Sequence, residues 1–293
     1  MKDYCLISTA YHGEARIYVS YSQALVEKAR TTHGTWPTAS AALGRFLTVS
    51  AMMGLMVKDG ESITLKIEGD GPIEYMLVET NAKGEVRGDI KNPEVYLTYN
   101  SGPKAGKLAV GKAVGNGYLH VTKDLNMRHN FTSSIALETG EIGDDFTYYF
   151  TSSEQTPSAV GLGVLVNPDQ SIKHAGGFII QLLPNASEQT ITQIEKVLSN
   201  IQAVTELFEQ GLSVEDITDI LSSGTAKKLS EHDIAYVCHC SKEKFAKSLE
   251  KLDVKTLQTF IEEDHGAEVV CHFCKSKYHF DEDELKKIHT IKH

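Results

Sequence analysis

Over residues 1–184, short stretches of alternating apolar and polar residues are separated by Gly, Asn or Asp, and this pattern predicts β-strands. The stretches are residues 6–21, with a turn at His12-Gly13, and residues 62–69, 73–90, 118–125 and 144–184. Between them, residues 22–34 and 38–57 carry apolar side chains at helical spacing. Strand runs with inserted helices are typical of the α+β class, so we expect an antiparallel sheet with packed helices over residues 1–184.

After residue 184 the pattern becomes helical. Apolar residues recur at spacings of three, four or seven and predict one amphipathic helix, which contains Ile191, Ile194, Leu198, Ile201 and Phe208. Residues 213–224 predict a second helix, with Ser213 as its N-cap and Asp216 three residues later. This segment is acidic and has no strand signal, so we expect a helical, amphipathic linker over residues 185–230.

The last sixty or so residues predict a third, small domain over residues 231–293. Its expected order is a short strand, two helices, a hairpin and a closing helix, over residues 234–240, 241–252, 253–264, 267–280 and 281–289. So small a domain has a small core, and a bound metal is a common way to stabilise such a unit.

Four of the five cysteines lie in this small domain. Cys238 and Cys240 form a C-x-C pair, and Cys271 and Cys274 form a C-x-x-C pair at the turn of the predicted hairpin. Two such pairs supply the four soft ligands that zinc takes in a tetrahedral structural site. We therefore expect one Zn²⁺ per chain, bound by the four sulfurs. The fifth cysteine, Cys5, stands alone in a predicted strand, where a small core residue is expected.

The spacing leaves two questions about this site open. His239, His272 and His279 neighbour the cysteines, so a mixed Cys/His site is an alternative, although each lies beside a thiol that already fills the position. The site is either purely structural or redox-active. Redox activity is possible because oxidants attack thiolates, and because the two cysteines of either pair are close enough in sequence to form a disulfide with each other. Loss of the ligands would release the metal and unfold so small a unit.

Charge and composition exclude several classes of partner. The formal net charge is −10, which disfavours a general attraction to nucleic acid or anionic lipid. Arg is absent after Arg128, so the side chains that most often read guanine are missing from the zinc-binding region. The apolar run at residues 47–57 is too short to span a bilayer, and the first ten residues contain Asp3 and no apolar signal core. We expect a cytoplasmic protein without nucleic-acid or membrane partners.

The sequence also lacks common catalytic and nucleotide-binding motifs. It contains no P-loop, no G-x-G-x-x-G, no H-E-x-x-H and no G-x-S-x-G. Asp144 and Asp145 are adjacent, and adjacent residues of a strand point to opposite faces, so a solvated turn is expected there rather than an acid/base pair. We predict that the protein is not an enzyme and needs no nucleotide.

Several longer motifs carry a resemblance to a known family. They are "HGTWPTASAALGR" at residues 33–45, "NAKGEVRG" at 81–88, "GDDFTYYFTSSEQTPSAVGLGVLVN" at 143–167 and "AGGFIIQLLP" at 175–184, together with the two cysteine pairs. In combination, and over nearly the whole chain, the sequence resembles the redox-regulated 33-kilodalton heat-shock chaperones of bacteria. The resemblance implies that Cys238, Cys240, Cys271 and Cys274 bind zinc when reduced.

The same resemblance implies a switch. Oxidation would form Cys238–Cys240 and Cys271–Cys274 disulfides and release zinc, the linker would unfold, and the protein would dimerise. The resulting protein would be an ATP-independent holdase that keeps unfolding and oxidatively damaged client proteins from aggregating. Two alternatives remain from the residues themselves. One is a zinc-stabilised adaptor with a constitutive protein-binding surface, and the other is a thiol-disulfide reductase that uses Cys271 and Cys274.

Overall fold

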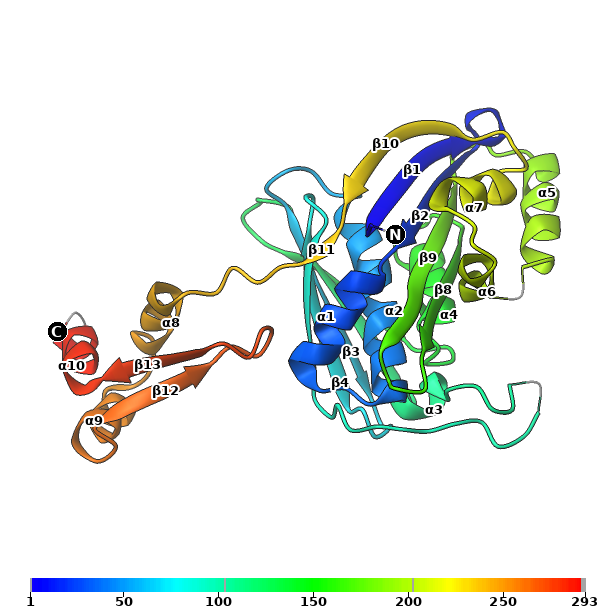
Figure 1. Ribbon diagram of the computed structural model, residues 1–293. Helices are drawn as coiled ribbons and strands as arrows, with labels where there is room; N and C mark the ends of the chain where they lie inside the picture. Colours follow the sequence, from blue (N-terminus) through cyan, green and yellow to red (C-terminus); the bar gives the residue numbers. More distant parts are fainter. Residues whose placement is uncertain (1, 103, 202, 291–293) are drawn as a thin grey trace. The chain divides into compact units, whose positions relative to one another are not determined.

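Two sheets, one antiparallel and one mostly antiparallel, enclose a helix in residues 1–237 of the computed structural model (Figure 1). The structure describes residues 2–102, 104–201 and 203–290. The first sheet has the order β10-β1-β2-β9-β8 and is antiparallel throughout. Its strands are β1 (Tyr4–Ala10), β2 (Ala15–Tyr21), β8 (Ser158–Val166), β9 (Ile172–Leu182) and β10 (Lys227–Asp233). The helices and sheets confirm the predicted α+β class.

The second sheet has the order β11-β5-β4-β3-β6-β7. Its strands are β3 (Ser62–Gly69), β4 (Tyr75–Asn81), β5 (Glu85–Ile90), β6 (Gly117–Asp124), β7 (Phe131–Ala136) and β11 (Ala235–Tyr236). All neighbours are antiparallel except β11, which pairs in parallel with β5. The strand β7 and the short helix α3 (Val110–Val114) have no counterpart among the predicted elements.

The helix α2 (Pro37–Gly54) lies between the two sheets and is buried nearly all round, as expected for the apolar run at residues 47–57. It packs against strands of both sheets and against α1 (Gln23–His33). Small residues allow this close packing. A Cβ at Gly44 would lie 2.6 Å from Val26 and 2.9 Å from Val164, so only glycine fits between α1 and β8 at this point.

Three helices cover the opposite face of the first sheet. They are α5 (Glu188–Ser199), α6 (Val204–Glu209) and α7 (Val214–Leu221). Their apolar side chains form one buried cluster with the sheet, which contains Leu6, Ile17, Val19, Phe178 and Ile180 from the strands and Ile194, Val204, Phe208, Ile217 and Leu221 from the helices. The predicted amphipathic segment therefore lies with its apolar face on the sheet, and Ser213 and Asp216 form the expected capping box of α7.

Three predictions about local structure are wrong. Residues 191–208 form two helices, because α5 ends at Ser199 and α6 begins at Val204. A strand, β10, begins at Lys227 inside the segment expected to be only helical, because the free edge of β1 pairs with it. The start of residues 144–184 is a helix, α4 (Gly143–Ser152), although the strands expected around the turn at residues 167–169 are present as β8 and β9.

The carboxylate of Asp145 explains the start of α4. Its Oδ1 accepts hydrogen bonds from the N–H groups of Glu138, Thr139 and Gly140 at 2.8–3.2 Å, and its Oδ2 accepts one from Ile142 at 2.8 Å. Asp145 is fully buried, so the expectation of a solvated turn for Asp144 and Asp145 is wrong for Asp145. A carboxylate that gathers unpaired N–H groups at the first turn stabilises a helix there.

The chain divides into two compact units, residues 1–237 and 238–293. The second unit contains the helices α8 (Lys242–Leu249), α9 (Val254–Glu262) and α10 (Glu282–Thr290) and the hairpin β12 (Gly266–Val270) and β13 (Lys277–Asp281). Ser241 and Asp253 cap α8 and α9 as predicted. The division does not separate residues 185–230 from the sheets, and it falls at residue 238 rather than at the predicted residue 231. Each unit is described by itself.

Candidate metal centre

Two turns of the second unit present the four cysteines. Cys238 and Cys240 lie in the segment before α8, whose N-cap is Ser241. Cys271 follows β12, and Cys274 lies in the turn of the hairpin. The turn closes through two hydrogen bonds, from Cys271 N–H to the Ser276 carbonyl and from Lys275 N–H to the Cys271 carbonyl, each 2.9 Å long. This turn directs both hairpin sulfurs toward the first pair.

The four sulfur atoms form one cluster and lie within 4.8 Å of one another. Cys238 Sγ lies 3.7 Å from Cys271 Sγ, and Cys240 Sγ lies 3.3 Å from Cys274 Sγ. A tetrahedral zinc with Zn–S bonds of about 2.3 Å separates its sulfurs by about 3.8 Å. The four cysteines are present as thiols rather than as disulfides. Soft ligands at this spacing could hold a metal ion, and they fit the donor set that zinc takes.

The surroundings of the four thiols differ. Burial raises the pKa of Cys271 to about 12 and also raises the pKa of Cys240. Burial acts in the same direction on Cys274, but its contacts with the hydroxyl and the N–H of Ser276 and with the sulfurs of Cys240 and Cys271 outweigh burial and lower that pKa to about 6. The thiolate form is therefore favoured at Cys274 and disfavoured at Cys240 and Cys271. Binding of a cation by all four sulfurs must release the remaining protons.

Tyr278 is a further residue of this site that sequence reasoning missed. Its hydroxyl lies 3.2 Å from Cys240 Sγ and 3.3 Å from the Cys240 carbonyl oxygen, and the hydrogen bond to the thiol raises the pKa of Tyr278 to about 12. Its ring packs against Phe245 with a centroid distance of 5.1 Å. Tyr278 thus joins the cysteine cluster to the small core of the second unit. Only its position in β13 beside the second pair could have pointed to this role.

The neighbouring histidines stay outside the cluster. His239, His272 and His279 are all exposed, and the group of possible metal ligands at this point, among the residues that the structure describes, contains cysteines alone. His279 Nε2 instead faces the carboxylate of Glu268 at 3.3 Å. The geometry favours the four-sulfur alternative over the mixed Cys/His site.

The remaining cysteine, Cys5, lies in β1, far from the other four in the sequence. Cys5 is fully buried in the core between the first sheet and α2, and burial raises the pKa of its thiol. It is a small core residue, as its isolated position in a strand predicts.

The second unit has a small apolar core of its own. Its buried core consists of Leu249, Leu257, Ile261, Phe280, Leu285 and Ile288. An ion pair between Lys242 and Glu284, with nitrogen–oxygen distances of 2.6 and 2.8 Å, links α8 to α10. Domains this small commonly depend on a metal or disulfides for stability.

Known proteins match this chain over nearly its whole length. The model of the family described as Hsp33 protein matches residues 3–281. The chain is 55% identical to the 33 kDa chaperonin of Acholeplasma laidlawii over 98% of this chain and 99% of that protein. It is 49% identical to the 33 kDa chaperonin of Geobacillus kaustophilus over 99% of each.

A solved structure is similar as well. The crystal structure of the 33 kDa chaperonin (heat shock protein 33 homolog) from Thermotoga maritima matches with a TM-score of 0.92 and 33% sequence identity, over 100% of this chain and 99% of that one. Among the described residues, no helix is both long and apolar enough to cross a membrane. On the family match and the near-complete coverage of these relatives, the chain belongs to the Hsp33 family.

Proposed function

We propose that this protein is a redox-regulated, ATP-independent chaperone, a holdase that keeps unfolding and oxidatively damaged proteins from aggregating. Chaperone activity agrees with the family and with the printed names of its relatives. The observation that supports the redox part is the cluster of four cysteine sulfurs, all present as thiols, within 4.8 Å of one another. In the reduced protein, Cys238, Cys240, Cys271 and Cys274 hold one Zn²⁺, which cross-links the two turns of the second unit.

Oxidation supplies the switch. Each new disulfide, Cys238–Cys240 or Cys271–Cys274, forms as two thiolates give two electrons to a peroxide, which takes up two protons and leaves as two molecules of water. The sulfurs of a disulfide no longer bind zinc, so two such bonds release the ion. Because the second unit has only a small core of its own, we expect it to unfold when the ion leaves.

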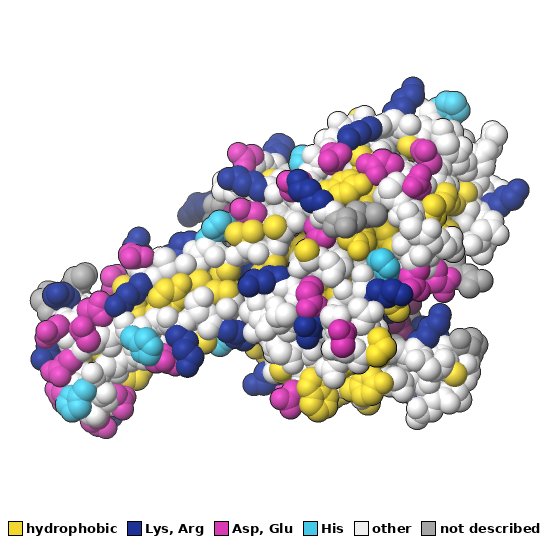
Figure 2. Space-filling view, viewed as in Figure 1, with side chains coloured by type: hydrophobic (Ala, Val, Ile, Leu, Met, Phe, Trp, Pro, Cys, Tyr) yellow, Lys and Arg dark blue, Asp and Glu magenta, His cyan; other side chains and the backbone are white. Residues whose placement is uncertain are grey.

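The linker helices supply the hidden client surface in this proposal. Their apolar side chains and those of the first sheet form a single buried cluster, so release of α5–α7 exposes both faces. With the helices docked, large exposed hydrophobic side chains of residues 1–237 are spread over several elements, and Trp36, Tyr96, Tyr118 and Phe131 are among them. On the face drawn in Figure 2, hydrophobic side chains are interspersed with charged ones.

Polar contacts hold the helices in place as well. The Tyr11 hydroxyl donates a hydrogen bond of 2.7 Å to the Leu221 carbonyl, and the Tyr4 hydroxyl donates one of 2.7 Å to Glu215. The first of these contacts is buried and the second is exposed, and both add to the apolar burial that holds the helices on the sheet. Helices of this length are marginal in water without a partner surface.

The remaining parts of the proposal concern partners. We propose unfolded polypeptides as clients and a homodimer as the activated form, in the cytoplasm, with no nucleotide, nucleic acid or membrane partner and no catalytic turnover. The net charge of −10 and the absence of a P-loop motif support this choice.

The deciding experiment measures zinc content and suppression of aggregation of a denatured client, each before and after treatment with hydrogen peroxide. We expect one zinc per reduced chain, loss of that zinc on oxidation and a parallel gain of activity. X-ray absorption should show four sulfur ligands. Activity that is constant while zinc remains bound would support the adaptor, and catalytic turnover of a dithiol substrate would support the reductase.

A further inference from the structure

The outer edge of the first sheet is formed by β8. Among the residues that the structure describes, β8 pairs with β9 on one side and with no strand on the other. The Val160 N–H donates to the Thr147 hydroxyl of α4 at 3.1 Å, so the main-chain groups of Val160 point away from β9. Because these groups alternate along a strand, those of Leu162 and Val164 point the same way. Within the described part of the chain, no strand therefore pairs with the outward main-chain donors and acceptors in the middle of β8.

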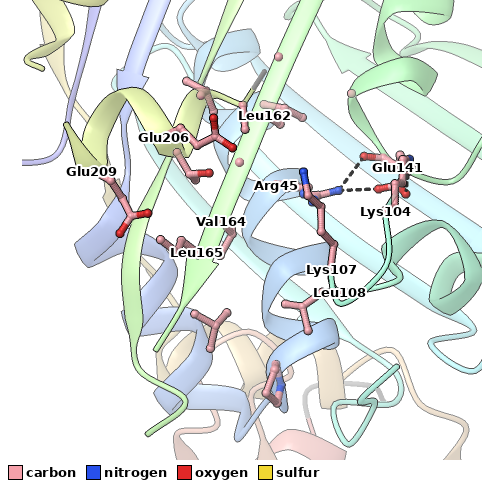
Figure 3. A pocket seen from close by; sticks show the side chains of 18 of the residues that line it. Arg45, Lys104, Lys107, Leu108, Glu141, Leu162, Val164, Leu165, Glu206 and Glu209 are labelled. Atoms are coloured by element: carbon pink, nitrogen blue, oxygen red, sulfur yellow. Dashed lines mark hydrogen bonds and ion pairs between the residues drawn. The ribbon is translucent and has the colours of Figure 1, made fainter. Parts of the chain in front are cut away.

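A groove of about 1080 Å³ follows this edge. Its lining includes β8 from Val160 through Val166, and Arg45 of α2 lies across from the strand together with Lys104 and Leu108 (Figure 3). Val160, Leu162 and Val164 also pack against the core around α2, so the edge has an apolar floor on that side. The groove thus combines unpaired backbone with apolar side chains.

Charged side chains of both signs line the groove, and several of them pair with one another. Arg45 Nη1 lies 2.8 Å from a carboxylate oxygen of Glu141, and Lys104 Nζ lies 2.9 Å from the other oxygen, which also accepts a hydrogen bond of 2.8 Å from the Tyr99 hydroxyl. Partial burial raises the pKa of Glu141, but Lys104, Arg45 and Tyr99 together lower it below its ordinary value. Because cations and anions both line the groove, it does not favour ligands of one charge, and main-chain pairing is the specific interaction that it offers.

We propose that this edge takes up an extended segment of an unfolded polypeptide as a sixth strand beside β8. The proposal rests on the holdase function above and names the mode by which one part of the client binds. Main-chain hydrogen bonds give affinity without reading sequence, while alternate side chains of the added strand fall on the apolar floor. A holdase must accept many unrelated chains, and an open edge strand is suited to that task.

The linker forms part of the same groove. Val204, Thr205 and Glu206 of α6 line it, and α6 lies so close to β8 that a Cβ at Gly163 would come within 2.8 Å of Val204 and 2.7 Å of Thr205. The glycine lets α6 approach the strand. When α6 leaves the sheet, the groove loses one wall and admits a longer segment. We therefore expect the oxidised protein to bind an extended peptide more tightly than the reduced protein does.

The test uses the full-length oxidised protein and a fluorescein-labelled octapeptide of alternating Val and Thr. Leu162→Pro removes one outward N–H of β8 and places a ring in the groove, and proline is tolerated on edge strands where the N–H faces outward. Leu162→Val is the matched control, because it also shortens the side chain but keeps the N–H. Fluorescence anisotropy should show binding weakened by about tenfold or more in the Pro variant, as expected for loss of one to two main-chain hydrogen bonds, and nearly unchanged in the Val variant.

A second measurement needs no protein variant. The same octapeptide, N-methylated at two successive central amides, cannot donate from either edge at its centre, so wild-type protein should bind it about tenfold more weakly or worse. Equal binding of both peptides would overturn the proposal. So would a Leu162→Pro variant that retains peptide binding but loses dimerisation, since the occupant of the edge would then be a second copy of the chain. Failure of the oxidised wild-type protein to suppress aggregation would instead overturn the proposed function.

Discussion

Replacement of Ile217 tests whether the linker helices are held by apolar burial. Ile217 lies in α7, is fully buried and belongs to the cluster that α5–α7 form with the first sheet. Truncation of such a side chain to Ala costs about 2–5 kcal/mol, because it removes buried methyl groups and leaves a cavity. The structure offers a matched control in Ile220, which lies in the same helix and is 40% exposed. There the same change should cost less than about 0.5 kcal/mol.

The assay is hydrogen exchange of the reduced, zinc-loaded protein. If α5–α7 open as a unit, the cost in Ile217→Ala lowers protection of their amides by about 30-fold or more, while amides in the second sheet keep theirs. Ile220→Ala should change protection by less than about threefold. The Ile217 variant should also suppress client aggregation without oxidation, because its client surface is exposed more often. Unchanged protection in Ile217→Ala, or equal effects of the two variants, would refute the idea that burial of this face controls exposure.

Further outcomes follow from other parts of the molecule. Cys271→Ser should lower the zinc content well below one per chain, as measured by metal analysis. Cys5→Ser should leave oxidative activation intact. If Cys5→Ser abolished activation, the assignment of the switch to the two cysteine pairs would be wrong. Hydrogen exchange after oxidation should show loss of protection first in residues 238–290, then in α5–α7, with the sheets unchanged; a linker that keeps full protection after zinc loss would contradict this order. Hydrogen bonds from the N–H and hydroxyl groups at the start of α5, from Ser187 first, lower the pKa of Glu14 to about 2. This contribution to linker docking is therefore present above about pH 4.5 and lost as the pH falls toward 2. An NMR titration of the Glu14 carboxyl group should give a higher midpoint in Ser187→Ala than in the wild-type protein.

The sequence identified the cysteine cluster because its signal is local. Residue type and spacing are sufficient to mark Cys238, Cys240, Cys271 and Cys274, and the structure brings their sulfurs together. The hydrogen bonds of Ser276 and Tyr278 to this cluster depend on how the hairpin folds, which no short pattern records. Similarly, the helical periodicity of residues 188–221 was evident, but the break between α5 and α6 was not.

Two of the wrong predictions about the fold have a common physical origin. The segment that forms α4 is rich in aromatic residues with high strand propensity, and it becomes helical where the buried carboxylate of Asp145 collects four N–H groups from residues 138–142. The strand β10 is largely polar and exposed, so it lacks an alternating apolar pattern, and its pairing with β1 determines its conformation. In both cases tertiary contacts outweighed local preference.

The positions of β9 and β10 in one sheet have a consequence for the return to the resting state. The segment that carries α5–α7 connects the end of β9 at Leu182 to the start of β10 at Lys227, so these helices belong to a loop anchored at both ends rather than to a free tail. As long as both strands remain paired, released helices stay near their own binding face at an effective concentration in the millimolar range. Because the loop is covalently tethered at both ends, redocking is intramolecular and needs no partner. The entropic cost of closing the loop depends only weakly on its length. Under the proposed function, the linker would then compete with weakly held clients for its own binding face after reduction.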